Sequence, residues 1–186
     1  MDPCNINIIR QITCYDLSAI FEVDLNGHKY ALKVFHDNGD SGYTEKGRDL
    51  NRFRRDLDAY KKLLTSGVCA RGFPRPRAIL LEYFPYAESL NCVDYSDAHL
   101  PQAIEGMHEI HRAGVHHQDI YPKNLLLVRG NPGRLVWIDF DVATTFTDFG
   151  PKQLARCDYE IALVKGLAEG MRDDQAEGLP PNTKFC

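Results

Sequence analysis

The chain has 186 residues, of which 44% are hydrophobic and 26% are charged, and its 22 basic and 26 acidic residues give a net charge of −4. These proportions are those of an ordinary folded domain, so they exclude a disordered tail, a low-complexity or collagen-like protein and a disulfide-stapled miniprotein. The mildly acidic balance argues against a general nucleic-acid or membrane-surface binder, which needs a strongly basic surface. The length suits one domain or two small lobes.

No segment has the pattern of an export signal or a membrane span. Residues 1–5 lack the positive flank and apolar run of a secretory signal, and the longest apolar runs, 78–81 and 125–128, are far too short to cross a bilayer. The six cysteines form no C-x-x-C pair and no cluster with histidine, so we expect free thiols of a reduced intracellular protein, with a disulfide framework or a zinc site as the alternative. We therefore expect a cytoplasmic or nuclear protein that is not secreted.

The first half of the chain is predicted to be rich in strands. Four apolar runs indicate strands at residues 8–9, 19–25, 29–35 and 78–84. Asn26-Gly27, between the second and third runs, is a strong signal for a hairpin turn. A polar loop follows at 36–47, and apolar residues at steps of three and four then predict an amphipathic helix over 49–64. The residues expected on its buried face are Leu50, Phe53, Leu57, Tyr60 and Leu64.

The second half is predicted to be more helical. A helix is expected over 100–113, where Gly114 is a stop signal, and another over 153–171. The side chains expected on the buried face of the first of these helices are Ile104, Met107 and Ile110 or His111. Two short apolar strands are predicted between the helices, at 125–128 and 135–138. Strands first and helices later are typical of an α+β fold, here divisible into two lobes.

The most informative polar residues lie around the first of these two short strands. Asp119 and Asn124 are five positions apart in the segment after the 100–113 helix, and Asp139 directly follows the second short strand. An acid on a loop, an amide a few residues later and a carboxylate at a strand end can converge on one cleft. Mg²⁺ prefers such oxygen ligands and usually shares them with phosphate oxygens. The pattern therefore indicates a phosphate-binding and metal-binding site.

These segments resemble the protein-kinase-like superfamily. His117-Gln118-Asp119, followed by Asn124, is similar to the H-R-D-x-x-x-x-N catalytic loop, and Asp139-Phe140-Asp141 is similar to the D-F-G metal motif. Upstream, residues 30–34 resemble the V-A-I-K strand and residues 81–84 resemble the hinge that holds adenine. The four motifs occur in the order of the family, and the resemblance covers roughly residues 12–169.

The resemblance implies a bilobal protein-kinase-like fold. Residues 1–81 would form an N-terminal antiparallel sheet plus one helix, residues 82–86 a hinge, and residues 87–186 a shortened, mainly helical C-terminal lobe. The implied activity is ATP- and Mg²⁺-dependent transfer of the γ-phosphate to a hydroxyl of a protein or a small molecule. Residues 137–140 after the His-x-Asp loop are also similar to the aminoglycoside and choline phosphotransferases. Neither a nucleic-acid nor a membrane partner is implied.

The resemblance also implies roles for individual side chains. Asp119 would be the catalytic residue that orients the acceptor hydroxyl and takes its proton. Asn124 and Asp139 would hold Mg²⁺, and Lys33 would be a second catalytic residue that pairs with the α- and β-phosphates. Phosphoryl transfer suits such a set of residues, because its catalysis consists mostly of positioning and charge neutralisation.

Three further residues would serve the nucleotide indirectly or through the backbone. Lys33 needs an acidic partner on the following helix, where the family has Glu and this chain offers Asp56 or Asp58. We prefer Asp56, which lies one helical turn before Tyr60. Glu82 and Phe84 fall in the hinge-like segment, whose backbone would hold the adenine.

Several positions depart from the family pattern. Residues 13–20 contain no glycine, although the Gly-rich phosphate loop is expected there. Gln118 replaces the arginine of the catalytic loop, Tyr121 replaces its lysine, and Asp141 replaces the glycine of the metal motif. These departures leave two alternatives open: a pseudokinase that binds nucleotide or acts as a scaffold without efficient turnover, and a phosphorylated-ligand site that serves another chemistry.

Two other patterns are interpreted as unrelated to the site. A literal D-F-G at 148–150 does not directly follow an apolar strand, so we take it as a chance match. His108, His111, His116 and His117 lie close together in sequence but lack a further ligand at matched spacing for a transition metal. We expect His117 to pack in the core beneath the loop and His116 to be partly exposed.

Overall fold

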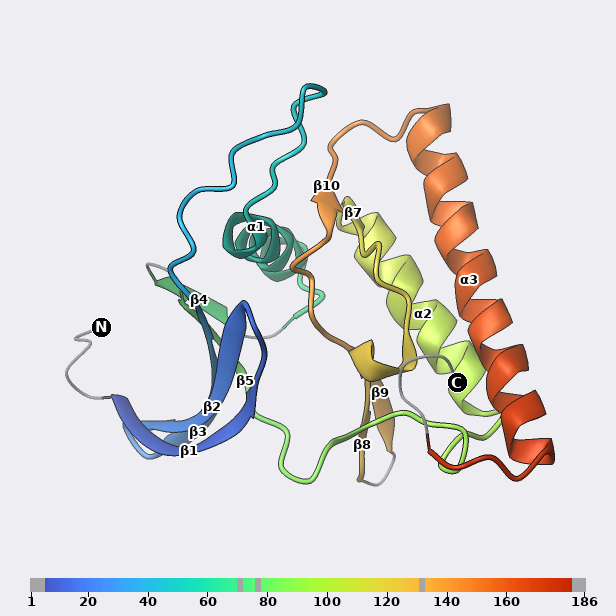
Figure 1. Ribbon diagram of the computed structural model, residues 1–186. Coiled ribbons are helices and arrows are strands. Elements are labelled where there is room, and N and C mark those ends of the chain that lie inside the picture. Colours follow the sequence, from blue (N-terminus) through green and yellow to red (C-terminus); the bar gives the residue numbers. More distant parts are fainter. Residues whose placement is uncertain (1–5, 70–71, 76–77, 131–132, 182–186) are drawn as a thin grey trace. The chain divides into compact units, whose positions relative to one another are not determined.

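The computed structural model describes residues 6–69, 72–75, 78–130 and 133–181. The chain divides into two compact units, Met1–Tyr83 (unit 1) and Phe84–Cys186 (unit 2). Both strands and helices are present, as Figure 1 shows, so the predicted α+β class is confirmed. The division falls within residues 82–86, the segment expected to be a hinge. That the two units are the lobes of a kinase-like fold stays a prediction.

Unit 1 is built on a five-stranded antiparallel sheet with the order β1-β2-β3-β5-β4. Its strands are β1 (Ile6–Cys14), β2 (Ser18–Leu25), β3 (His28–Phe35), β4 (Gly72–Arg75) and β5 (Ala78–Glu82). Asn26 and Gly27 join β2 to β3 with φ values of 55° and 79°. Two successive left-handed residues match the twist of the flanking strands, so the predicted hairpin is confirmed.

The strand predictions differ from the structure at the sheet edges. β1 is longer than the predicted 8–9, because most of its side chains are exposed and the sequence therefore has no apolar alternation there. β4, the other edge strand, is not predicted at all. β5 ends at Glu82, two residues before the predicted end. Edge strands form through backbone pairing, which an apolar pattern does not report.

Helix α1 (Arg52–Thr65) begins later than predicted because Asn51 caps it, accepting a hydrogen bond from the backbone N–H of Arg54 at 3.1 Å. The predicted buried face is wrong at its ends, since Leu50 and Leu64 are 41% and 38% exposed. The fully buried side chains of α1 are Asp56, Ala59 and Leu63. An acidic residue occupies the inner stripe because it has a cationic partner inside unit 1, described below.

Unit 2 combines two long helices with short strands (Figure 1). The helices are α2 (His99–Arg112) and α3 (Pro151–Ala176), which pack against each other. The strands form two small sheets: β6 (Glu88–Ser89), β8 (Leu125–Val128) and β9 (Arg134–Trp137) in the order β6-β8-β9, and β7 (Val115–His116) with β10 (Thr144–Thr145). A short 3-10 helix, η2 (Pro122–Asn124), leads into β8. The two-residue strands β6, β7 and β10 are too short for a sequence pattern to predict.

Trp137 fixes β9 against α2. Its indole Nε1 donates a hydrogen bond to the carbonyl of Ala103 at 3.0 Å. A Cβ on Gly106 would lie only 3.1 Å from the indole ring, so glycine permits this close approach. On the predicted buried face of α2, Met107, Ile110 and His111 are buried, whereas Ile104 is half-buried.

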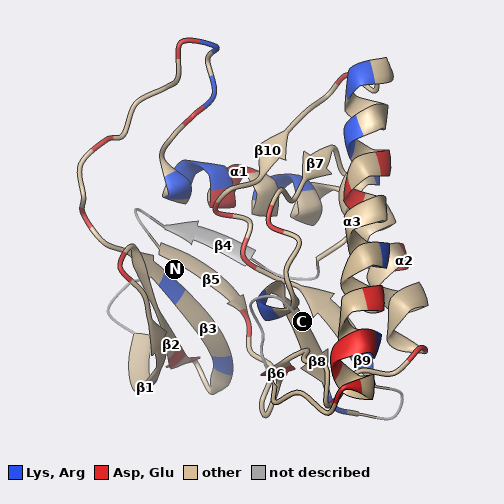
Figure 2. Ribbon diagram, turned by 45° about the vertical axis from the view of Figure 1, so that its right-hand side comes forward, with Lys and Arg blue, Asp and Glu red and all other residues tan. Residues whose placement is uncertain are grey.

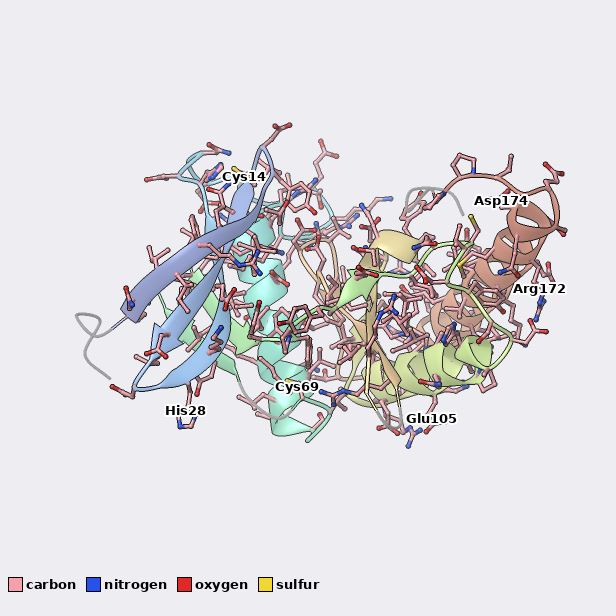
Figure 3. The ribbon with its side chains drawn as sticks, turned by 90° about the horizontal axis from the view of Figure 1, so that it is seen from below. Cys14, His28, Cys69, Glu105, Arg172 and Asp174 are labelled. Atoms are coloured by element: carbon pink, nitrogen blue, oxygen red, sulfur yellow. The ribbon has the colours of Figure 1, made fainter. Side chains whose placement is uncertain are left out.

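The cysteines and the lengths of the helices bear on two predictions about the chain. Cys14, Cys69, Cys92 and Cys157 are free, as predicted, while Cys4 and Cys186 lie outside the described residues. Figure 3 labels Cys14, the last residue of β1, and Cys69, which lies after the end of α1. Within the described ranges, every helix is too short or too polar to cross a membrane.

Candidate functional site

Unit 1 contains a buried ion pair between Lys33 and Asp56. Lys33 lies in β3 and its Nζ is 2.8 Å from Oδ2 of Asp56 on α1; both side chains are at most 5% exposed. Nζ also lies 4.9 Å from the centre of the Phe35 ring. Asp58, the other acid proposed as a partner of Lys33, is exposed, and its Oδ1 lies 3.7 Å from Nζ of Lys61. The structure therefore brings together Lys33 and Asp56.

We expect Asp56→Ala to lower the free energy of unfolding by about 3–5 kcal/mol, because it leaves the Lys33 ammonium buried without this carboxylate. Asp58→Ala, on the exposed face of the same helix, should change it by less than about 0.5 kcal/mol. Urea denaturation of both variants measures the difference. Similar losses in the two variants would show that the buried ion pair stabilises unit 1 no more than an exposed aspartate does.

In unit 2, Asp119 and Asn124 meet. The Asn124 amide nitrogen donates hydrogen bonds to Asp119 Oδ2 at 2.7 Å and to the Asp119 carbonyl at 2.8 Å. The Asn124 carbonyl accepts the N–H of Ile138 at 3.0 Å, so the same residue also holds the segment that leads to Asp139. η2 places Asn124 because Pro122, at its first position, suits the start of a helix.

Lys123 adds a cation that the sequence reasoning overlooks. Its Nζ lies 3.1 Å from Asp119 Oδ2 and 5.4 Å from the centre of the Tyr121 ring. The lysine side chain is 47% exposed, so its ammonium remains accessible. The spacing of four residues within H-Q-D-I-Y-P-K-N is the only signal that could have pointed to it.

His117 connects the loop to the segment before Asp139. Its Nε2 is 3.0 Å from the carbonyl of Ile138, and its Nδ1 accepts the N–H of Asp119 at 3.3 Å. Because a carbonyl only accepts, Nε2 carries the proton and the ring is neutral. The ring is fully buried beside Trp137 and Phe140, which confirms the prediction that it packs in the core.

His116 is also buried, so the prediction of partial exposure is wrong. Its Nε2 lies 3.2 Å from the carbonyl of Gln153 on α3, and its ring stacks on Phe146 with 4.3 Å between centres. The β7–β10 pairing and α3 together cover it, and neither contact has a sequence signature.

Glu160, on α3, is hydrogen-bonded to the backbone of the loop at residues 117 and 118. Its Oε1 accepts the N–H of Gln118 at 2.7 Å, and its Oε2 accepts the N–H of His117 at 3.1 Å and faces His111 Nε2 at 2.8 Å. Burial raises the pKa of this carboxyl, but the hydrogen bonds from His111 and the two backbone groups outweigh burial and lower the pKa below its ordinary value. Sequence reasoning misses Glu160, because an acid on a long helix normally faces solvent.

The backbone is strained at two positions next to these side chains. Gln118 and Asp139 have φ values of 66° and 65°, in the left-handed region that residues with a side chain rarely adopt. Each costs on the order of 1–3 kcal/mol, and such strain is concentrated at functional sites. The Gln118 side-chain amide also donates to Thr144 Oγ1. The turn before Asp119 and the one containing Asp139 are therefore held in place by their surroundings.

The remaining predicted residues lie as follows. Asp139 is half-buried, two residues after β9, and Asp141 is buried. Glu82 is the last residue of β5 and its side chain is exposed. Phe84 opens unit 2, where the Arg134 guanidinium lies 5.0 Å from its ring centre. Across the described ranges, no three His, Cys, Asp or Glu side chains are grouped so that they could hold a metal by themselves.

Stability should depend on pH through two buried histidines and one half-buried histidine. Burial lowers the pKa of His99, His116 and His117 below the ordinary value of 6.5. The unfolded chain therefore binds protons near pH 6.5 while the folded chain does not, so stability falls as the pH drops below about 6.5. His117, which is fully buried, contributes up to about 1.4 kcal/mol per pH unit, and the less enclosed His99 and His116 contribute less. Urea denaturation at pH 7.5, 6.5 and 5.5 tests this expectation, and equal stability at all three values contradicts it.

The chain matches no protein-family model and no curated protein sequence.

Proposed function

We propose that the chain is an ATP- and Mg²⁺-dependent phosphotransferase of the protein-kinase-like superfamily, acting on a hydroxyl of a protein or a small molecule. The observation that carries the proposal is the loop around Asp119. Its carboxylate is 2.7 Å from the Asn124 amide, and the backbone before it is fixed by the buried Glu160 carboxylate. A preorganised acid and amide suit phosphoryl transfer, in which the protein mainly positions groups and stabilises charge.

The two oxygens of Asp119 differ in a way that suits a general base. Oδ2 is engaged by Asn124 and Lys123, whereas Oδ1 makes no hydrogen bond with any residue in the described part of the chain. The side chain is 21% exposed, so it can reach an acceptor. In the proposed reaction, Oδ1 orients the acceptor hydroxyl and takes its proton as the phosphoryl group leaves ATP.

The ligands proposed for Mg²⁺ lie in unit 2. Asn124 uses its amide nitrogen for Asp119, so its amide oxygen would be available as a ligand, and Asp139 would supply a carboxylate. Mg²⁺ is usually held by one or two carboxylate-type ligands together with phosphate oxygens and water, so a larger set of acids is not required. When bound, the ion would neutralise charge on the phosphates.

Two lysines would meet the phosphates. Lys33, held by Asp56, is proposed to pair with the α- and β-phosphates. Lys123 lies 3.1 Å from Asp119 and is proposed to face the group being transferred. It would thus take over the role of the family's catalytic-loop lysine, whose position Tyr121 occupies. Glu82 and Phe84 are proposed to hold the adenine through their backbone.

One observation favours the alternative of a pseudokinase. Residues 15–17 join β1 to β2 where the family has its Gly-rich phosphate loop, and the N–H of Tyr15 is bonded to the Ser18 carbonyl at 2.8 Å. This amide is thus used within the turn, and the side chain of Asp16 adds negative charge nearby. Fewer amides are left for a phosphate than a glycine loop provides.

Nucleotide binding is the direct test. Addition of Mg²⁺–ATP at about 100 times its dissociation constant should stabilise the folded chain by about 2.7 kcal/mol, seen as a rise in the thermal midpoint. The paired variant Lys33→Met with Asp56→Asn removes both buried charges together and should abolish the rise, whereas Lys61→Ala on the exposed face of α1 should keep it. No rise at millimolar nucleotide contradicts the proposal. A rise without ADP production favours the pseudokinase.

A further inference from the structure

Helix α3 has one face that the described residues of unit 2 leave exposed. Its inner face carries the buried side chains Glu160, Val164, Ala168 and Met171. On the opposite side, Tyr159 is 65% exposed and Leu163 is 40% exposed. Ala155, Ala162 and Gly166 are exposed beside them, at the spacings that place residues on one side of a helix. We call this set of five residues the outer stripe.

Opposite charges flank the outer stripe at its two ends. Lys152 and Arg156 lie at the N-terminal end, and Asp173 and Asp174 lie at the C-terminal end, as Figure 2 shows by blue and red segments on α3. Figure 3 labels Asp174 close to that C-terminal end. None of the four forms an ion pair with another residue in the part of the chain that the structure describes.

This charge order opposes the dipole of the helix itself. A helix is stabilised by acids near its N-terminus and by bases near its C-terminus, because its N-terminal end carries partial positive charge. α3 has no acid in its first turn and no base in its last turn. The stability of the isolated helix therefore does not account for the order of its charges.

We propose that the outer stripe is a homodimer interface, in which α3 of a second copy lies antiparallel across a two-fold axis. In this arrangement Lys152 and Arg156 of each copy face Asp173 and Asp174 of the other. Leu163 and Gly166 lie midway between these two charged pairs and would sit at the axis. The dipoles of the two helices also oppose each other, which is favourable.

The side chains of the outer stripe suit a helix–helix contact. A Cβ built on Gly166, in the outer stripe, meets no atom within 4 Å, so this small residue leaves room for a close approach. Tyr159 and Leu163 provide the larger side chains that pack into such gaps. The helix has 26 residues, which at 1.5 Å per residue gives a contact up to about 39 Å long.

A second copy is favoured over a different protein because one helix supplies both halves of the contact. A two-fold interface requires a surface that is complementary to itself, and the order of base, apolar centre and acid meets that requirement when the helix is reversed. A different partner would need only one of the two charged ends.

Sedimentation equilibrium of the full chain at low salt should show a reversible dimer in the micromolar range, and added salt should weaken it by screening the end charges. Lys152→Glu with Arg156→Glu should weaken self-association at least about tenfold, and so should Asp173→Lys with Asp174→Lys. An equimolar mixture of these two variants should form a heterodimer, because each end then meets its opposite. Lys165→Glu, on α3 but outside the outer stripe, is the control and should leave the dimer unchanged.

Several results would overturn the proposal. A wild-type chain that stays monomeric at about 200 µM has no such interface, and its outer stripe then faces another partner or solvent. A dimer that neither charge reversal weakens uses a different surface. Variants that self-associate poorly but do not form a heterodimer when mixed, while retaining wild-type circular dichroism, rule out the antiparallel pairing.

Discussion

Asp119→Asn should reduce the turnover number of the chain about 10²- to 10⁴-fold while leaving its affinity for Mg²⁺–ATP nearly unchanged. The amide has the size and shape of the carboxylate and can still accept the hydrogen bond from Asn124, which spans 2.7 Å in the wild type. It cannot take a proton from an acceptor hydroxyl. Production of ADP under saturating acceptor measures turnover, and the nucleotide-dependent rise of the thermal midpoint measures binding.

The exposed Asp148 provides a matched control for this expectation, since it begins the literal D-F-G at 148–150. Asp148→Asn should leave turnover within about twofold of the wild type, whereas Asp139→Asn should lower it through weaker binding of Mg²⁺. A larger loss of turnover for Asp148→Asn than for Asp139→Asn would show that residues 148–150, and not Asp139, bind the metal. Wild-type turnover in Asp119→Asn would show that Asp119 is not the catalytic base.

Glu160→Ala should lower the free energy of unfolding by about 3–5 kcal/mol, the range found when one partner of a buried charged group is removed. The carboxylate accepts hydrogen bonds from the N–H groups of His117 and Gln118 and faces His111 Nε2 at 2.8 Å. Removing it leaves both backbone donors unsatisfied, and each unsatisfied donor alone costs on the order of 1–3 kcal/mol. Urea denaturation monitored by circular dichroism measures the loss.

Two comparisons separate the role of Glu160 from a general effect on α3. Glu169→Ala removes an exposed acid from the same helix and should change stability by less than about 0.5 kcal/mol. Glu160→Gln keeps one accepting oxygen but turns an NH₂ group towards a hydrogen-bond donor. Its free energy of unfolding should therefore lie between those of Glu160→Ala and the wild type. Equal stability of Glu160→Ala and Glu169→Ala would mean that the loop does not depend on α3.

The elements that were predicted well are those in which local chemistry decides the structure. The Asn26-Gly27 turn follows from two residues that tolerate positive φ, and β8 occupies residues 125–128 as expected, because an apolar run that begins at the buried Leu125 marks it. Asp56 was preferred to Asp58 because of its spacing along the helix, and it is Asp56 that meets Lys33 at 2.8 Å.

What the sequence does not reveal depends on contacts between distant segments. β4 and β10 exist because other strands pair with them, and strands of four and two residues are too short to be predicted from sequence alone. The contacts of Glu160 with the loop span 42 and 43 positions of the chain, and nothing near Glu160 in sequence marks it as an inward-facing acid. The left-handed backbone of Gln118 is likewise set by its surroundings, since glutamine has no preference for that conformation.

The separation between Glu160 and the loop has a consequence during synthesis. At about 5–20 residues per second, the ribosome needs several seconds to add the residues that separate Gln118 from Glu160. Throughout that interval the N–H groups of His117 and Gln118 have no α3 carboxylate to bind, so this loop cannot reach its final conformation while the nascent chain is still short. α3 is therefore the last-made element on which the loop around Asp119 depends, and ribosome-bound chains that stop before Glu160 should expose this loop to proteases.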